Sequence, residues 1–362
     1  MLNNIIAIFC VVGAIDYIIG KKFGVGKEFE GGIMLLGPMA LSMVGMILLA
    51  PLIAKWLLPL TSFISKHTPF DPSILSGMLL ANDMGGSPLS AAIAENALIG
   101  DFNGLVVGAT LGATVSFTIP FALSVISKEY HPDMLIGILC GIGTVPIGCI
   151  VSGIMLGIPF GALIIDMIPV AVFSILVILG LLKFPMASVK IFSILGKVII
   201  GFITFGLVLG ILNRLVGITV LEGLAPLDDG IDVIVNAACV MTGAFPLIHI
   251  LAKILNRPFS ALGKKIGLDH KSILGFVASL ASFANCTPLI PSMNKKGRIA
   301  NLAFAVSAAF TFAGHLAFTM SVNKAFVAPV IVGKLVSGVT AVAVALLIYK
   351  KLYGKSEVSS DN

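Results

Sequence analysis

The chain is 362 residues long; 58% of its residues are hydrophobic and only 11% are charged, against roughly 25% charged in ordinary soluble domains. Its formal net charge of +6 is carried by segments between apolar runs, which is typical of membrane loop topology rather than of nucleic-acid binding. The composition therefore excludes an ordinary soluble domain and indicates a protein whose solvent is a lipid bilayer.

Nine apolar runs are long enough to cross a bilayer. In chain order they are residues 2–19, 33–58, 104–127, 134–156, 159–182, 194–216, 231–255, 300–322 and 326–348. The opening residues MLNN contain no basic segment, and no small-residue cleavage site follows the first run. We therefore predict a retained first span rather than a signal peptide.

Two further apolar stretches, residues 74–99 and 273–293, are broken in the middle by polar residues, Gly and Pro. Such residues free backbone groups from helical pairing, and this is tolerated at membrane depth only where protein or water satisfies those groups. We predict that both stretches are re-entrant helical hairpins. The expected fold is thus an all-α polytopic membrane protein with about nine full transmembrane helices and two opposed hairpins.

The loop charges predict the orientation. With the basic tail at residues 350–362 in the cytoplasm, nine crossings place most lysines and arginines on the cytoplasmic side, as the positive-inside rule requires. If both broken stretches crossed fully, the basic stretch 256–271 would instead lie outside. The N-terminus is therefore predicted outside and the C-terminus in the cytoplasm.

The chain contains an internal repeat. Matching residues recur in the same order at a nearly constant offset, which is typical of carriers built from two structural repeats. The first copy has Met43, Gly45, Ala54, Lys55, Leu57, Ser73, Pro88, Thr114 and Phe121, and the second has Met241, Gly243, Ala252, Lys253, Leu255, Ser272, Pro288, Thr311 and Phe318. We predict inverted repeats at 1–156 and 194–349, joined by a transmembrane helix and cytoplasmic linker at 157–193.

The two hairpin tips are the predicted substrate site. The first tip contains Asn82, Asp83 and Ser87, and a carboxylate at that depth costs about 2.5–3.5 kcal/mol on insertion scales, so it needs a partner. The second tip offers the amide of Asn285 and the hydroxyl of Thr287. Facing one another, the tips would suit a small alcohol that carries an ammonium group. Internal pairing of Asp83, or helix capping by the other residues, is the structural alternative.

Three further polar residues within apolar runs are candidates for proton or ion coupling. These are Asp16, Asp166 and His315. An interfacial position is the alternative for Asp16, and a neutral, hydrogen-bonded histidine is the alternative for His315. Separately, Gly104, Gly108 and Gly112 recur every four residues and predict a face for close helix contact.

Nothing in the sequence indicates an enzyme, a metal site or a bound cofactor. The chain lacks a GxSxG elbow, an HExxH motif and a phosphate-binding loop. Its five cysteines show no paired CxxC spacing and lie in apolar segments, so we expect reduced, buried thiols. No nucleic-acid partner is expected.

The sequence resembles the ethanolamine utilisation protein EutH family of bacterial membrane transporters. The resemblance is carried by Gly20-Lys21-Lys22-Phe23-Gly24-Val25-Gly26, Phe29-Glu30-Gly31-Gly32, Gly37-Pro38-Met39-Ala40-Leu41-Ser42-Met43-Val44-Gly45 and, most specifically, Leu80-Ala81-Asn82-Asp83-Met84-Gly85-Gly86. It extends over most of the chain, including Ala284-Asn285 and Asn294-Lys295-Lys296-Gly297. The resemblance implies uptake of ethanolamine across the cytoplasmic membrane. It supplies no binding residues, so those named above rest on the residue pattern alone.

A shorter likeness concerns the fold. Two opposed hairpins, one containing Phe283-Ala284-Asn285, are similar to concentrative nucleoside transporters, which move a transport domain like an elevator. This similarity implies an elevator-like carrier and an oligomer formed through scaffold spans. The nucleoside carriers' recognition motif is not reproduced at the first tip, so sodium coupling is not implied. A nucleoside carrier and a membrane amine sensor that does not transport are the alternative functions.

Overall fold

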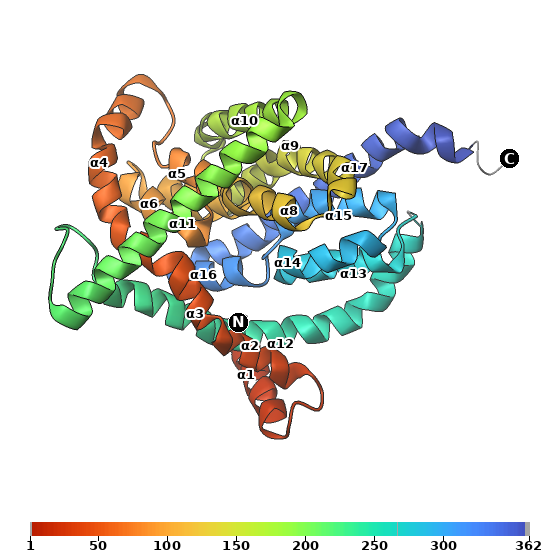
Figure 1. The fold of residues 1–362 in the computed structure, drawn as a ribbon, viewed down its shortest axis with the longest axis horizontal. Helices are drawn as coiled ribbons and strands as arrows, with labels where there is room; N and C mark the ends of the chain where they lie inside the picture. The colour runs from red at the N-terminus through yellow and green to blue at the C-terminus, as the bar shows by residue number, and fades with distance from the viewer. Residues whose placement is uncertain (1, 266, 359–362) are drawn as a thin grey trace.

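The computed structural model describes residues 2–265 and 267–358, and within these ranges every regular element is a helix. The first half of the chain contains α1 (Leu2–Ile18), α2 (Val25–Met34), α3 (Leu36–Met39), α4 (Gly45–His67), α5 (Ile74–Leu79), α6 (Gly86–Ile93), α7 (Ala97–Asp101), α8 (Ile119–Val125) and α9 (His131–Met155). The second half contains α10 (Phe160–Lys183), α11 (Pro185–Val216), α12 (Leu227–Lys265), α13 (His270–Ala281), α14 (Phe283–Cys286), α15 (Lys295–Ala308), α16 (Gly314–Val322) and α17 (Val327–Val358). As Figure 1 shows, α1 and α2 project from one edge and the end of α17 from another.

Short π- and 3₁₀-helices join these elements. The π-helices are η1 (Ala40–Val44), η3 (Phe102–Gly112) and η4 (Thr114–Thr118). The 3₁₀-helices are η2 (Asn82–Met84), η5 (Lys128–Tyr130), η6 (Thr287–Ser292) and η7 (Lys324–Phe326). Segments of this kind often occur at functional sites in proteins, and here η2 and η3 lie where the candidate site is found.

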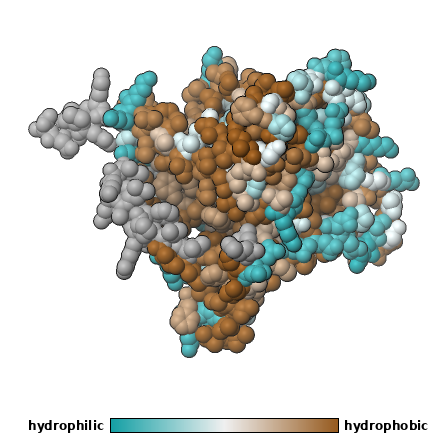
Figure 2. Space-filling view, turned by 180° about the vertical axis from the view of Figure 1, so that it is seen from behind, coloured by the Kyte–Doolittle hydropathy of each residue, from teal (hydrophilic) through white to brown (hydrophobic). Residues whose placement is uncertain are grey.

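The long helices match a bilayer. In the described part of the chain, seven helical stretches are long and apolar enough to cross a membrane, and α1 is apolar but shorter. Burial differs sharply among them: 83% of the apolar window in Ala97–Val125 is buried, against 28% in Lys190–Val216. Figure 2 shows one face of the molecule, most of whose surface is apolar. The protein is thus a multi-pass helical membrane protein whose outer helices, such as α11, present apolar side chains to lipid.

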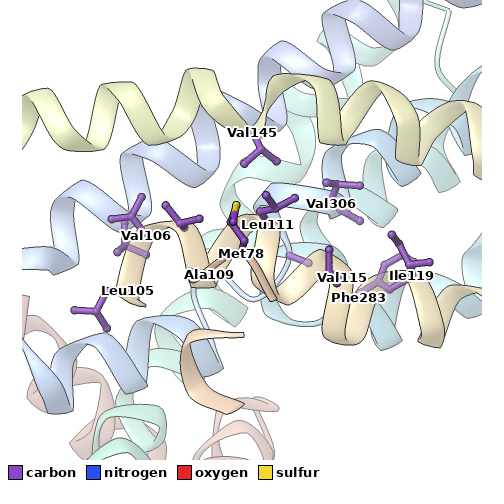
Figure 3. Packing of buried hydrophobic residues seen from close by; sticks show 14 of the residues in the cluster. Met78, Leu105, Val106, Ala109, Leu111, Val115, Ile119, Val145, Phe283 and Val306 are labelled. Atoms are coloured by element: carbon purple, nitrogen blue, oxygen red, sulfur yellow. The ribbon is translucent and has the colours of Figure 1, made fainter. Parts of the chain in front are cut away.

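The segment η3–η4–α8 runs through the centre of the molecule. Apolar side chains of this segment, including Leu105, Leu111 and Val115, belong to the largest buried cluster, together with Phe283 and Val306 from the second half (Figure 3). The predicted face of small residues is confirmed by the close approach of the first broken stretch. A Cβ on the glycines at 104, 108 or 112 would lie 2.6, 3.2 or 2.0 Å from an atom of that stretch.

Asp71 joins the two ends of the first broken stretch. Helices α5 and α6 pack side by side, and the Asp71 carboxylate accepts hydrogen bonds from the N–H of Ser73 at 2.9 Å and from those of Glu95 and Asn96 at 3.0 Å each. One side chain therefore holds both the start and the return of the stretch. The side chain of Asn96 then caps α7.

Asp269 does the same in the second half. Its carboxylate accepts from the N–H of Ser272 at 2.7 Å and, in a short hydrogen bond, from the N–H of Asn294, whose side chain caps α15. Partial burial acts to raise the pKa of the Asp269 carboxyl, but these N–H groups outweigh it and hold that pKa below 3.8. A depressed pKa means that this contribution to stability is complete at neutral pH and is lost as the pH falls below that value.

We expect Asp269→Ala to loosen the two ends of the second broken stretch and to leave the first broken stretch unchanged. Removing two hydrogen bonds to a carboxylate should cost about 2 kcal/mol locally. Amide hydrogen exchange should quicken at Ser272 and Asn294 and remain unchanged at Ser73 and Asn96, whereas Asp71→Ala should give the opposite pattern. If either variant accelerated amide hydrogen exchange equally in both stretches, Asp71 and Asp269 would not act independently of one another.

One predicted span is broken. The run 300–322 was expected to form a continuous helix, but α15 ends at Ala308 and α16 begins at Gly314. Between them Phe310 adopts a left-handed backbone with φ of 62°. The N–H groups of Phe310 and Phe312 donate to the carbonyl oxygens of Ser279 and Leu280 at the end of α13, at 3.1 and 3.0 Å. These bonds satisfy backbone groups that the break in the helix leaves unpaired. Because the run 300–322 is not one continuous helix, fewer than nine of the predicted spans are full helices in the described part of the chain.

The two halves of the chain are interlocked rather than separate. Helices α1 and α2 pack on α12, and α9 packs on α15 and α17. Buried hydroxyl groups cross the same boundary: Thr114 donates to the Val306 carbonyl oxygen at 2.9 Å, Thr144 to that of Ser337 at 3.2 Å and Ser152 to that of Pro329 at 2.8 Å. The predicted repeats therefore share a single core.

The boundaries of the predicted segments shift in detail. Helix α11 begins at Pro185, so most of the linker expected before residue 194 is helical. Helix α17 continues to Val358 into the predicted tail 350–362, of which residues 359–362 lie outside the described part.

The cysteine prediction is confirmed for three residues. Cys140, Cys149 and Cys286 are buried, free thiols. Cys239 is also free but is exposed on α12, and Cys10 is only partly buried. The expectation of burial was wrong for Cys239 because its side chain lines an open pocket between α1 and α12.

Candidate functional site

The first tip is a short turn held against π-helix η3. The chain leaves α5 extended at Leu80, forms η2 and turns into α6 at Gly85, whose φ is 102°. A side chain at Gly85 is strained by this left-handed backbone, and its Cβ would also lie 1.9 Å from Cγ of Met46. Asn82 rests on η3, since a Cβ on Gly108 would come within 3.2 Å of the Asn82 Cα. Gly85 therefore permits the turn, and Gly108 permits the close approach of Asn82 to η3.

Asn82 and Asp83 differ in exposure. Asn82 is fully buried, and neither Oδ1 nor Nδ2 has a hydrogen-bond partner among the described residues. Leaving a buried polar group unpaired costs about 1–3 kcal/mol, so such a group is available to a ligand. The Asp83 side chain keeps 23% of its surface exposed. The tip thus combines a reachable carboxylate with an unpaired amide.

His315 faces the Asp83 carboxylate. Its Nε2 lies 3.9 Å from the Asp83 Oδ1, and a Cβ on Gly314 would come within 3.4 Å of the other carboxylate oxygen. Both residues begin α16, so Asp83 lies near a helix N-terminus, where backbone N–H groups favour negative charge. The His315 ring packs 5.3 Å from that of Phe310, and its Nδ1 has no partner in the described part of the chain. The break in the span 300–322 is what brings His315 to the first tip.

Lys334 was not among the predicted site residues, although the structure places it in this cluster. It lies within α17, only 2% of its surface is exposed, and its ammonium donates a short hydrogen bond to the Ala109 carbonyl oxygen on η3. It also interacts electrostatically with Asp83. The sequence could have indicated Lys334, because a lysine in the middle of an apolar span is by default a candidate functional residue.

The second tip does not meet the first through hydrogen bonds in the described part of the chain. Asn285 is exposed, and the Thr287 hydroxyl donates to the Ala284 carbonyl oxygen at 2.9 Å. The neighbouring Phe283 packs edge-on against Phe121 of α8. The structure therefore places α16, rather than this tip, beside Asp83. Ser87 is buried in the first turn of α6.

The remaining predicted residues lie outside this cluster. The Asp16 carboxylate accepts hydrogen bonds from the N–H of Phe23 at 3.0 Å and of Gly26 at 2.7 Å, which orders the turn between α1 and α2. Asp166 is buried on α10, where it interacts with Asn103 and Asp71 at the base of the first broken stretch. These contacts place the Asp16 carboxylate in the turn after α1 and leave Asp166 as a buried carboxyl beside a second acid.

Two open pockets lie away from Asp83. One of about 430 Å³ lies between α1, α12 and α16, with Asn236 and Lys324 in its lining. The other, of about 370 Å³, includes Lys55 and Glu95. Neither lining includes Asp83 or His315. We place the candidate site at the tip because a buried, unpaired amide and a reachable carboxylate are adjacent there.

Comparison with known proteins places the whole chain in one family. The family model described as "Ethanolamine utilisation protein, EutH" matches residues 1–348. A protein of Listeria monocytogenes named probable ethanolamine permease EutH is 41% identical over 360 residues, covering 98% of this chain and 96% of that protein. A protein of the same name from Escherichia coli is 34% identical over 389 residues, with 97% and 95% covered.

A third relative, named uncharacterized protein YxeR, comes from Bacillus subtilis and is 35% identical over 341 residues, covering 94% of this chain and 92% of that protein. No solved structure gave a significant match. The family match and the curated relatives span the first tip, the second tip and most of α17. The chain belongs to the ethanolamine utilisation protein EutH family.

Proposed function

We propose that this protein carries ethanolamine into the cell across the bacterial cytoplasmic membrane. Curated relatives that match nearly the whole chain are named probable ethanolamine permeases. The observation that carries the proposal for this chain is the reachable Asp83 carboxylate next to the unpaired Asn82 amide. A protonated amino alcohol complements that pair, because its ammonium donates to the carboxylate and its hydroxyl can both donate to and accept from the amide.

In this proposal Asp83 binds the ammonium and Asn82 the hydroxyl, with Ser87 in the same turn. Asn285 and Thr287 join them when the second broken stretch closes on the site. The two stretches act as opposed re-entrant hairpins of an inverted repeat, which suits alternating access with the N-terminus outside. His315 and Asp166 remain candidates for proton coupling, since one faces the binding carboxylate and the other is buried beside Asp71. The outer apolar helices are the proposed scaffold of an oligomer.

Radiolabelled ethanolamine uptake into proteoliposomes tests this function. We expect saturable uptake that increases with an inside-negative membrane potential, because a bound ammonium carries its charge across. A pH step at constant potential separates carriage of the ammonium from carriage of the neutral amine, which crosses lipid unaided to some extent. Vesicles without protein are the control. Nucleoside uptake without ethanolamine uptake would contradict the substrate, and specific ethanolamine binding without any flux would indicate a sensor.

A further inference from the structure

Lys334 is a buried cation in the transmembrane core. It lies on α17, only 2% of it is exposed, and its ammonium donates a hydrogen bond to the Ala109 carbonyl oxygen. A charged group at this depth is costly unless it is paired, because the desolvation penalty is several kcal/mol per ion. One carbonyl group satisfies one of three ammonium donors and neutralises no charge. The position therefore calls for an anion.

Asp83 and Lys334 lie beside the same turn of η3, but no salt bridge joins them in the described part of the chain. The backbone of Asn82 packs against Gly108, and Lys334 bonds to the next residue, Ala109. Helix η2 contacts both η3 and α16, and α16 contacts α17, so the elements that carry Asp83 and Lys334 share neighbours. The two charged groups interact electrostatically across this turn.

Lys334 and the proposed substrate offer Asp83 the same chemical group. Both are primary ammonium ions with three donors on a flexible carbon chain. They differ in that an amino alcohol also brings a hydroxyl, which the unpaired Asn82 amide can bind. In the structure the lysine donates to the Ala109 carbonyl oxygen and makes no hydrogen bond to that amide.

We propose that Lys334 is a tethered competitor that neutralises Asp83 when no substrate is bound, and that the substrate's ammonium displaces it. This rests on the function proposed above. The competition sets specificity, since a ligand must gain more at the site than the lysine does. An amine without a hydroxyl group only replaces the lysine's ammonium with its own at Asp83, so its net gain in binding free energy is small. An amino alcohol adds hydrogen bonds to Asn82 and takes over the charge of Asp83, while the lysine keeps its bond to the Ala109 carbonyl oxygen.

The pairing is tested without any ligand by a double-mutant cycle on the purified protein in detergent. The variants are Asp83→Asn, Lys334→Met and the two combined, and thermal unfolding is the measurement. Each single change leaves one charge buried without its partner and should lower Tm, whereas the double variant should recover most of the loss. Lys351→Met, which removes an exposed lysine from the same helix, is the matched control and should leave Tm unchanged.

A second pair of measurements connects the lysine to substrate. Binding of ethanolamine and of ethylamine, which lacks the hydroxyl, is followed by thermal shift. Lys334→Gln keeps a donor for the Ala109 carbonyl oxygen but removes the charge, so it serves if Lys334→Met does not fold. We expect this variant to bind ethanolamine about tenfold more tightly, and ethylamine by a larger factor, because the competitor for Asp83 has been removed.

The outcomes separate this proposal from the proposed function. Additive Tm losses in the cycle, or ethanolamine binding that Lys334→Gln leaves unchanged or weakens, would overturn the role of Lys334. A non-additive cycle in a protein that binds neither amine would support the charge pair and overturn the substrate. A non-additive cycle together with tighter amine binding supports both.

Discussion

Asp83→Asn is expected to reduce saturable ethanolamine uptake about 100-fold or more. Removing one member of a desolvated charge pair typically costs 2–5 kcal/mol or more, and each 1.4 kcal/mol is a factor of ten in affinity. The asparagine is nearly isosteric, so the turn held by Gly85 and the contact with Gly108 are retained. Initial rates of radiolabelled uptake into proteoliposomes, at matched protein content, give the measurement.

Two variants sharpen this prediction. Asp232→Asn removes an exposed carboxylate from α12 and should transport at the normal rate. Asp83→Glu keeps the charge but lengthens the side chain toward His315, so it should retain part of the activity. Normal uptake by Asp83→Asn would show that the carboxylate is not the ammonium ligand.

Gly112→Ala is expected to destabilise the protein by about 3 kcal/mol, the upper end of the usual cost of overpacking a core. An added Cβ would lie 2.0 Å from the carbonyl oxygen of Leu80 and 2.5 Å from that of Gly77. Both are backbone atoms, so the contact is relieved only by moving α5 and the tip that follows it. Thermal unfolding in detergent should show a lowered Tm, and ethanolamine uptake should fall because Asn82 and Asp83 shift with the backbone.

Gly201→Ala on α11 is the matched control. No heavy atom lies within 4 Å of a Cβ built at that position, so the substitution meets open space. Its effect on the free energy of unfolding should stay within about 1 kcal/mol, in the direction of stabilisation, because alanine favours a helix over glycine. An equal loss for the two glycines would mean that general helix effects, and not the approach of α5, explain the Gly112 result.

The membrane class and the packing face of the central segment were predictable from the sequence because they depend on local composition and spacing. Glycines every four residues, at 104, 108 and 112, predict that another backbone approaches this face of the segment. Asp71 and Asp269 were not singled out in the sequence, and their role as clamps became visible only in the backbone contacts.

The break at residues 309–313 could not be read from the sequence. No proline interrupts Ala309–Ala313, and the left-handed residue is a phenylalanine rather than a glycine. The segment unwinds because the end of α13 offers two free carbonyl oxygens as acceptors, at Ser279 and Leu280. That information lies in the tertiary arrangement. Without the break, the expected arrangement was two tips facing one another, with His315 in a helix interior.

Lys334 illustrates a different difficulty. Its burial was implied by the apolar run around it, but its anionic partner lies in the other half of the chain. The predicted internal repeat gave no indication of the Asp83–Lys334 pair, because the second tip, which it matches to the first, contains no charged residue. Only the shared contact with the turn of η3 at Gly108 and Ala109 brings the two residues together.

The buried hydroxyl bonds across the two halves have a mechanical consequence. Thr114, Thr144 and Ser152 each donate across the boundary in a medium without water, where breaking such a bond leaves both groups unsatisfied. In the alternating access proposed above, we therefore expect the elements they join, η4 and α9 with α15 and α17, to move as one rigid body. Hinges are restricted to segments outside this body, and labels that follow the motion belong on its boundary with α4, α11 and α12.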